Sequence, residues 1–380
     1  MSSFLFATVD AGGNVPPVVA IGRELIARGH RVRILGHEPQ RASLEAAGFE
    51  FTAYSRMPRW EPTRAKSVPR AIADLLRLST HAGLGRDLID LVTESPADLV
   101  VVDCMLLSVL EAAGASGLRH AVLFHTFYRF WNREWMRGPV GGLARLRGLD
   151  ARALWARADL ELVVCDRMLD PAGDTETPTR LWSGVVETGA RRVADPAEPP
   201  LVLVSLSTTW FPGQDDAYRH ILAALAELPV RAIVTTGPAV SPDALWAPAN
   251  VEVLAFAPHD AILPRVSAVI GHGGHSTTMA ALAHDLPLII MPMHPLIDQP
   301  MIARAVVDAG ACIRLSRTAS PGDIRRAVTT LLATEGYAEA AAVIGARLRA
   351  AGGARVAADL LLRAAAAPGP AIGALPLERD

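Results

Sequence analysis

The sequence predicts an α/β protein built of two Rossmann-like domains with a cleft between them. First, residues 4–9, 15–28 and 32–35 form a strand, helix and strand pattern, and this βαβ unit requires a parallel sheet. Second, the same alternation restarts at residue 201, after a segment rich in proline, glycine and charge. Third, 380 residues with 51% apolar composition are enough for two hydrophobic cores.

The first domain is expected to span residues 1–190. Its strands are predicted at 4–9, 32–35, 49–54, 98–103, 120–124, 160–165 and 181–185, and its helices at 15–28, 68–80, 84–94 and 106–115. Pro16 and Pro17 stand at the start of the first helix, where proline is tolerated. Residues 56–69 contain three prolines and predict an irregular segment. The aromatic run at 124–135, FHTFYRFWNREW, stands out in a chain with only 5% aromatic residues.

The second domain is expected over residues 201–365, after a linker at 186–200 and before a mobile tail at 366–380. Its strands are predicted at 201–206, 230–235, 251–255, 268–270 and 288–291. Its helices are predicted near 216–227, 259–263, 321–334, 337–349 and 355–365, with two more starting near residue 275 and after residue 298. Whether the last helices cross back to the first domain stays open.

Composition excludes several classes of protein. A formal charge of −2 argues against a nucleic-acid partner. Three widely spaced cysteines indicate buried thiols in a reducing compartment, and the first ten residues predict a strand rather than a signal peptide. No apolar run approaches about 18 residues, so a cytoplasmic protein without a membrane span is expected. A homodimer stays open.

The stretch from Ser267 to Cys312 carries the clearest chemical pattern. A short apolar strand ends in Gly271-His272-Gly273-Gly274, and a helix follows. A strand, a glycine turn and a helix N-terminus form an anion site, because free backbone N–H groups and the helix dipole point at the ligand. The next strand is followed by a polar pair, Asp298 and Gln299, which is expected at the same rim of a parallel sheet.

These residues resemble the donor-binding signature of nucleotide-sugar-dependent glycosyltransferases of the GT-B fold, and are most similar to the bacterial natural-product branch of the UDP-glycosyltransferase-like family. The resemblance implies that His272 contacts the donor diphosphate, that Ser276 and Thr277 bind phosphate, and that Asp298 and Gln299 bind sugar hydroxyls. The implied donor-binding residues are Ser207, Thr208, Phe256, Ala257, His272, Gly273, Gly274, His275, Ser276, Thr277, Asp298 and Gln299.

Each of these assignments has a simpler structural alternative. Ser276, Thr277 and Asp298 could be ordinary helix caps. The hydroxyls of Ser207 and Thr208 could belong to a plain loop, and residues 256–258 could be a strand end that turns at a proline. Ala280 stands where plant members carry a ribose-binding glutamate, which favours a thymidine-diphosphate sugar over a uridine-diphosphate sugar.

The resemblance further implies inverting, metal-independent glycosyl transfer to a small hydrophobic natural product, which needs no cofactor. The sequence itself offers no metal cluster, since Asp215 and Asp216 are adjacent rather than spaced as Asp-x-Asp. The Gly-x-Gly-x-x-Gly fingerprint of NAD and FAD enzymes is also missing. Trp60, Phe127, Phe130 and Trp131 are candidates for acceptor binding, and their alternative is packing in the core.

The first loop departs from the family. Asn14 stands where members carry the histidine that acts as general base, and Asp103 resembles the aspartate that orients it. An amide cannot accept a proton near neutral pH. Three explanations stay open. Another base can replace the histidine, Asp10 first and His125 second. Alternatively, the acceptor is acidic enough to need no base, or the chain is a silent helper of a partner transferase. A nucleotide-sugar epimerase of the same architecture is a further alternative.

Overall fold

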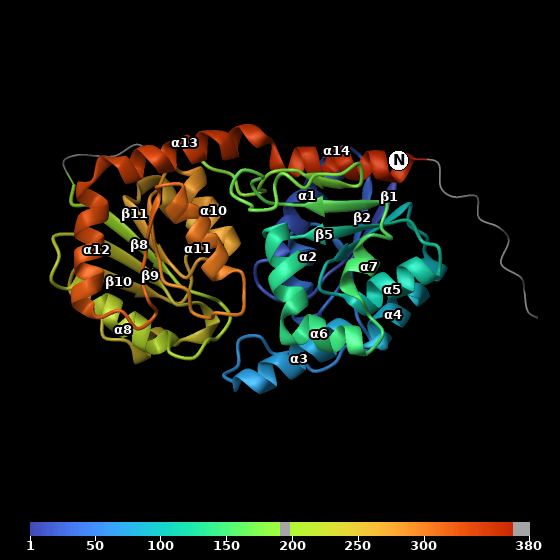
Figure 1. The fold of residues 1–380 in the computed structure, drawn as a ribbon, viewed down its shortest axis with the longest axis horizontal. Coiled ribbons are helices and arrows are strands. Elements are labelled where there is room, and N and C mark those ends of the chain that lie inside the picture. Colours follow the sequence, from blue (N-terminus) through green and yellow to red (C-terminus); the bar gives the residue numbers. More distant parts are fainter. Residues whose placement is uncertain (191–197, 368–380) are drawn as a thin grey trace, which may run out of the picture.

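The computed structural model describes residues 1–190 and 198–367, which form two α/β lobes, each around its own parallel sheet (Figure 1). The predicted linker at 186–200 lies partly outside the described residues. Of the predicted tail at 366–380, only residues 366 and 367 are described. In the described part of the chain, no helix is both long and apolar enough to cross a lipid bilayer.

The first lobe contains a seven-stranded sheet in the order β3-β2-β1-β4-β5-β6-β7, in which each neighbouring pair is parallel. Its strands are β1 (Ser3–Ala7), β2 (Arg31–Gly36), β3 (Glu50–Ala53), β4 (Leu99–Asp103), β5 (His120–Phe124), β6 (Leu160–Val163) and β7 (Arg180–Trp182). The central strands β4 and β5 are buried throughout, because helices cover both faces of the sheet. The order reverses between β1 and β4, where ligands of doubly wound sheets bind.

Seven helices of the first lobe connect these strands: α1 (Val15–Ala27), α2 (Arg41–Ala46), α3 (Val68–Thr80), α4 (Ala82–Glu94), α5 (Leu107–Ala115), α6 (Pro139–Leu146) and α7 (Ala151–Trp155). Short segments add η1 (Glu38–Gln40) and the π-helical η2 (Phe130–Trp135). The predicted helices at 15–28, 68–80, 84–94 and 106–115 are all present. Sequence patterns missed α2, α6, α7 and η2, which are short or lack a clear apolar stripe.

The second lobe contains a six-stranded parallel sheet in the order β10-β9-β8-β11-β12-β13. Its strands are β8 (Leu201–Ser205), β9 (Arg231–Thr235), β10 (Val251–Leu254), β11 (Ala268–Gly271), β12 (Leu288–Ile290) and β13 (Cys312–Arg314). Its helices are α8 (Gln214–Leu225), α9 (His259–Ile262), α10 (His275–Ala283), α11 (Gln299–Asp308), α12 (Pro321–Ala333) and α13 (Glu335–Ala351), with short turns η3 (Gly237–Ala239), η4 (Pro242–Ala244) and η5 (Leu263–Arg265).

The last two helices join the lobes. Helix α13 packs on α10 of the second lobe, whereas α14 (Gly353–Ala366) packs on α1 of the first lobe, and the two run end to end along one side of the molecule (Figure 1). Arg347 of α13 holds the buried Asp166 carboxylate of the first lobe with two bonds, at 2.9 and 3.1 Å. The structure therefore settles what the sequence left open: the chain crosses back at residue 352, inside the range predicted for the second domain.

The chain passes between the lobes twice, once after β7 and once at residue 352. These two segments, called the first and second crossing, contact each other at glycines. Gly352 adopts a left-handed φ of 78°, which ends α13 and turns the chain into α14. A Cβ placed on Gly353 would lie 1.8 Å from the carbonyl oxygen of Val185, on the first crossing. No side chain larger than hydrogen fits there without moving one crossing away from the other.

Substituting Gly353→Ala is expected to lower the free energy of unfolding by about 1–3 kcal/mol, the usual cost of overpacking. Gly336→Ala is the matched control, since a Cβ there meets nothing within 4 Å, and alanine is the better helix former at that site in α13. Urea denaturation of both variants measures the difference. Equal stability of Gly353→Ala and the wild type would contradict the close contact of the two crossings.

Candidate nucleotide-sugar and acceptor site

The turn between β11 and α10 can be formed only with glycine at two positions. Gly273 has a φ of 85°, and a Cβ on it would lie 2.8 Å from Ile290 Cγ2. A Cβ on Gly274 would lie 2.4 Å from His272 Nε2, so the imidazole lies directly over this glycine. The turn therefore presents bare backbone and the His272 ring at the carboxyl edge of the second sheet.

Three helices begin at this edge without a side-chain cap. Gly213, Gly274 and Asp298 occupy the N-cap positions of α8, α10 and α11, and none of them caps the helix through a side-chain hydrogen bond. By contrast, α12 starts with a full capping box between Ser320 and Asp323. Uncapped N-termini leave backbone N–H donors and the positive end of the helix dipole for an anion. The cap alternative for Ser276, Thr277 and Asp298 is therefore wrong.

Two buried histidines flank the turn. Burial lowers the pKa of His272 to about 4, although the nearby backbone of Ser205 acts in the opposite direction, and burial lowers the pKa of His275 to about 3. Both rings are therefore neutral near pH 7 as long as no anion lies beside them. Among the described residues, His272 Nδ1 and His275 Nε2 are sealed from solvent and have no hydrogen-bond partner. Buried ring nitrogens without a partner beside a helix N-terminus require a structural or functional explanation.

Asp298 and Gln299 lie at the start of α11 on the same edge. Asp298 Oδ2 accepts a 2.8 Å bond from Thr126 Oγ1 of the first lobe, and burial raises the pKa of the Asp298 carboxyl. Gln299 Oε1 accepts bonds from the backbone N–H groups of Met293 and His294, at 2.7 and 3.3 Å. This arrangement fixes the loop after β12 and leaves the Gln299 NH₂ group without a hydrogen bond to the described residues.

The lobes meet at this edge. Thr126 bonds Asp298, and the Phe127 ring lies edge-on to the His275 ring with centroids 6.0 Å apart. Nearby, the Trp210 N–H of the second lobe donates to the carbonyl oxygen of Pro62 at 3.4 Å. The aromatic run of the first lobe therefore faces the glycine turn of the second, as expected of a site shared by both lobes.

Asn14 is a structural residue in this arrangement. It is fully buried, and its Nδ2 donates to Val9 O at 2.8 Å and to Asp103 Oδ2 at 3.0 Å. Its Oδ1 accepts from the Ala11 N–H at 3.2 Å. All its polar atoms are therefore engaged in shaping the first loop. The amide contacts Asp103, as expected for the position of the family histidine, but an amide does not take up a proton near neutral pH.

His125 lies next to the same carboxylate. Its Nδ1 is 3.2 Å from Asp103 Oδ2, although the angle misses that of a hydrogen bond and Nδ1 has no other partner among the described residues. A small rotation of the ring would complete the bond. The carboxylate is fixed from the other side by Asn14 and by the Met105 N–H, which donates to Oδ1 at 2.9 Å. Asp103 and His125 thus form a histidine–carboxylate pair at the carboxyl ends of β4 and β5.

Asp103, Cys104 and His125 also bring three ligand atoms within 4.8 Å of one another, a set that residue spacing alone did not indicate. The set suits a metal ion poorly. Burial and the neighbouring Asp103 charge raise the pKa of the Cys104 thiol well above its usual value, so the thiolate is disfavoured. Both Asp103 oxygens already accept hydrogen bonds. The group is therefore better described as a histidine and a carboxylate in close contact beside a buried thiol.

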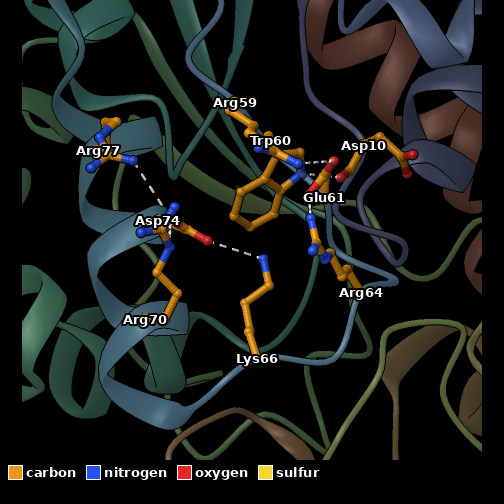
Figure 2. A network of polar contacts seen from close by, with 9 residues as sticks. All are labelled: Asp10, Arg59, Trp60, Glu61, Arg64, Lys66, Arg70, Asp74 and Arg77. Carbon is orange, nitrogen blue, oxygen red and sulfur yellow. Dashed lines mark hydrogen bonds and ion pairs between the residues drawn. The ribbon is translucent and has the colours of Figure 1, made fainter.

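Asp10, the first candidate for the base, lies in the first loop next to Trp60. Trp60 Nε1 donates to its backbone oxygen at 2.5 Å, and its carboxylate is directed away from the indole, where its charge acts on His37 (Figure 2). Lys66 Nζ lies 5.5 Å from the centre of the Trp60 ring and 3.1 Å from Asp74 Oδ2. This network clamps Trp60 over the first loop and holds it at the acceptor side of the site.

The other predicted residues differ in exposure. Phe256 is 81% exposed, and Thr208 is also exposed, so both side chains are open to contact from outside the protein. Ser207 is buried, and its hydroxyl accepts the Thr209 N–H at 3.1 Å, so it behaves as part of an ordinary loop. Ala257 is nearly buried at the end of the β10 segment.

The three aromatic acceptor candidates are buried in the hydrophobic core of the first lobe: Phe127, Phe130 and Trp131 are at most 5% exposed. Packing therefore describes these rings, and Trp60, which is half-buried, is the candidate that remains open to an acceptor. Two functional contacts escaped sequence reasoning. Thr126 stands inside the aromatic run, and Glu187, whose carboxylate lies next to Ser276, stands in the linker. No local pattern distinguishes either residue.

Substituting Gly274→Ala is expected to weaken the binding of a nucleoside diphosphate by about tenfold or more, because the new methyl group displaces the His272 ring from the turn. Gly271→Ala is the matched control, since its Cβ would lie 3.6 Å from the nearest atom, an ordinary contact. Isothermal titration calorimetry measures both affinities. Unchanged affinity in Gly274→Ala would exclude this turn from the binding site.

Known proteins resemble the chain in both sequence and structure. Residues 219–360 match the family model described as "Erythromycin biosynthesis protein CIII-like, C-terminal domain". The 4'-demethylrebeccamycin synthase of Lentzea aerocolonigenes is 27% identical over 86% of this chain and 91% of its own length. The GtfE glycosyltransferase of Amycolatopsis orientalis is 27% identical over 97% of this chain and 99% of its own length.

Among solved structures, the calicheamicin glycosyltransferase CalG4 superposes with a TM-score of 0.78 and 23% sequence identity, covering 97% of this chain and 100% of its own. The likeness covers both lobes, so it extends the sequence match beyond the C-terminal part. The chain therefore has the GT-B fold of CalG4, residues 219–360 match an EryCIII-like C-terminal domain, and the chain is similar to natural-product glycosyltransferases over most of its length.

Proposed function

We propose that this protein transfers a sugar, with inversion, from a nucleoside diphosphate sugar to a small hydrophobic natural-product acceptor. One observation carries the proposal. The Thr126–Asp298 bond joins the end of β5 to the start of α11. The pair of His125 and Asp103 therefore lies on the same side as the uncapped N-termini of α10 and α11. A general base on one lobe and an anion cradle on the other then face the same space.

The donor is proposed to bind along the edge of the second sheet. Its diphosphate would accept hydrogen bonds from the first turn of α10 and from the His272 ring, while sugar hydroxyls meet Asp298 and the free Gln299 amide. The nucleoside would lie against the exposed Phe256 ring. Ala280 offers no acceptor to a ribose 2′-hydroxyl, so a thymidine-diphosphate sugar is favoured.

In the proposed reaction the acceptor hydroxyl attacks the anomeric carbon in line with the departing diphosphate. A new carbon–oxygen bond forms as the bond from that carbon to the β-phosphate oxygen breaks, which inverts the configuration. His125 takes the hydroxyl proton at Nε2, because its Nδ1 faces Asp103, and the carboxylate stabilises the imidazolium. The dipoles of α10 and α11 stabilise the charge of the leaving diphosphate.

The activity test incubates the protein with thymidine- and uridine-diphosphate sugars, each with and without phenolic and polyketide acceptors. We expect free nucleoside diphosphate and glycosylated acceptor only when both substrates are present. An epimerised sugar formed without acceptor would indicate an epimerase instead. No product with any pair, despite measurable donor binding, would favour a helper that lacks catalysis, the role that Asn14 suggests.

His125→Ala is expected to lower turnover on an alcohol acceptor on the order of 10²-fold or more, and much less on an acidic phenol, whose proton leaves more readily. Asp10→Asn serves as the control and should retain most activity, because its carboxylate lies toward His37 rather than Asp103. Steady-state rates with both acceptors measure the effect. A large loss in Asp10→Asn with full activity in His125→Ala would reverse the assignment.

A further inference from the structure

A carboxylate from the linker reaches the anion cradle. Glu187 follows β7 on the first crossing between lobes, and its carboxylate lies next to the Ser276 hydroxyl in the first turn of α10. The residue as a whole is half-buried, but its Oε2 is sealed from solvent and has no hydrogen-bond partner among the described residues. A carboxylate oxygen without a partner at a helix N-terminus is unusual, and it lies where the proposed diphosphate needs Ser276.

The linker cannot easily move this carboxylate away. A Cβ on Gly189 would lie 2.1 Å from the carbonyl oxygen of Ala283, so the linker lies directly against the C-terminal end of α10. Glu187 and Gly189 therefore contact opposite ends of the same helix. The carboxylate is positioned by two contacts on α10 and has little room to swing out.

An ionised carboxylate next to a bound diphosphate is unfavourable, because like charges repel strongly in a poorly solvated site. The protein has two ways to remove this repulsion, since the side chain can leave or can take up a proton. The contact of Gly189 with the Ala283 carbonyl opposes departure of the Glu187 side chain. Uptake of a proton suits the site, because burial already raises the pKa of the Glu187 carboxyl, against the weaker opposite effect of Ser276.

We propose that Glu187 takes up one proton when the nucleotide diphosphosugar binds, and that the neutral carboxyl then donates a hydrogen bond from Oε2 to a phosphate oxygen. The proton comes from solvent, and no covalent bond changes. This inference deepens the proposed function and rests on it. It assigns Glu187 as a positioning residue that makes donor affinity depend on pH.

The other titratable groups around the linker act differently. His272 and His275, on the turn and first residue of α10, have pKa values lowered to about 4 and about 3, so both are neutral before the donor binds. At the far end of α10, Arg349 of α13 is paired with Asp285 at 2.7 Å, and their charges offset each other. His272 and His275 both compete for the proton, because a nearby diphosphate would favour the charged form of either ring.

Because proton binding and donor binding are thermodynamically linked, the direction in which donor affinity changes with pH can be derived. Binding that raises a carboxyl pKa takes up protons between the free and bound values, so donor affinity is highest at low pH. It falls by roughly tenfold per pH unit through that window. Glu187→Gln removes the titration while keeping the shape and a hydrogen-bond donor. Its affinity should therefore match that of the protonated wild type and stay constant as the pH rises.

The experiment titrates thymidine-diphosphate glucose and uridine-diphosphate glucose into the full chain by calorimetry, from about pH 5.5 to about pH 8.5, in buffers of different ionisation enthalpy. Both phosphates of such sugars are diesters that stay ionised throughout, so an observed proton comes from the protein. We expect close to one proton taken up by the wild type and by Glu94→Gln, a control on the surface of the first lobe, and none by Glu187→Gln.

Three results would overturn the inference or its basis. Proton uptake that persists in Glu187→Gln but disappears in His272→Asn or His275→Asn would place the proton on that histidine. Binding by the wild type without proton uptake would refute the coupling while leaving the proposed function intact. Absence of binding by every variant and sugar would refute the proposed function itself. The wild-type proton count needs no substitution, so the test stands even if a variant fails to fold.

Discussion

The buried carboxylate of Asp103 is the group around which the acceptor side of the site is arranged. A charge with almost no access to water is tolerated only if hydrogen bonds replace its hydration. Asn14 and the Met105 N–H supply such bonds, and the His125 ring lies 3.2 Å from the same carboxylate on a third segment. The need to solvate one carboxylate therefore fixes the first loop, the end of β4 and the end of β5 relative to one another.

The side of the site proposed for the sugar donor shows the opposite feature, because several of its hydrogen-bonding groups have no partner among the described residues. The N-termini of α8, α10 and α11 converge without side-chain caps, and two neutral histidine rings beside them lack partners among the described residues. Each unpaired buried group costs about 1–3 kcal/mol, so the arrangement lowers the stability of the free protein in exchange for an anion site. Helix α12, which begins at the same edge after β13, carries a complete capping box instead.

The two sides are brought together by the crossings between lobes and by a small number of direct contacts. Helices α13 and α14 span both lobes, and the Arg347–Asp166 pair ties the second lobe to the first (Figure 1). Thr126 and Asp298 then join the catalytic edges directly. Because Glu187 lies on one of these crossings, the connection between lobes and the electrostatics of the donor site share a residue.

The sequence by itself determined the two parallel sheets, the restart at residue 201 and the glycine turn at His272, because these depend on local periodicity and on backbone conformations that only glycine adopts. It also showed that Asn14 cannot be a base, which follows from the chemistry of an amide.

Only the tertiary structure decided that His125 rather than Asp10 lies beside Asp103, and that Phe130 and Trp131 belong to the core. It alone brought Glu187 to Ser276. Such contacts join residues far apart in the chain, and the packing of whole elements, which no local pattern encodes, sets their distances.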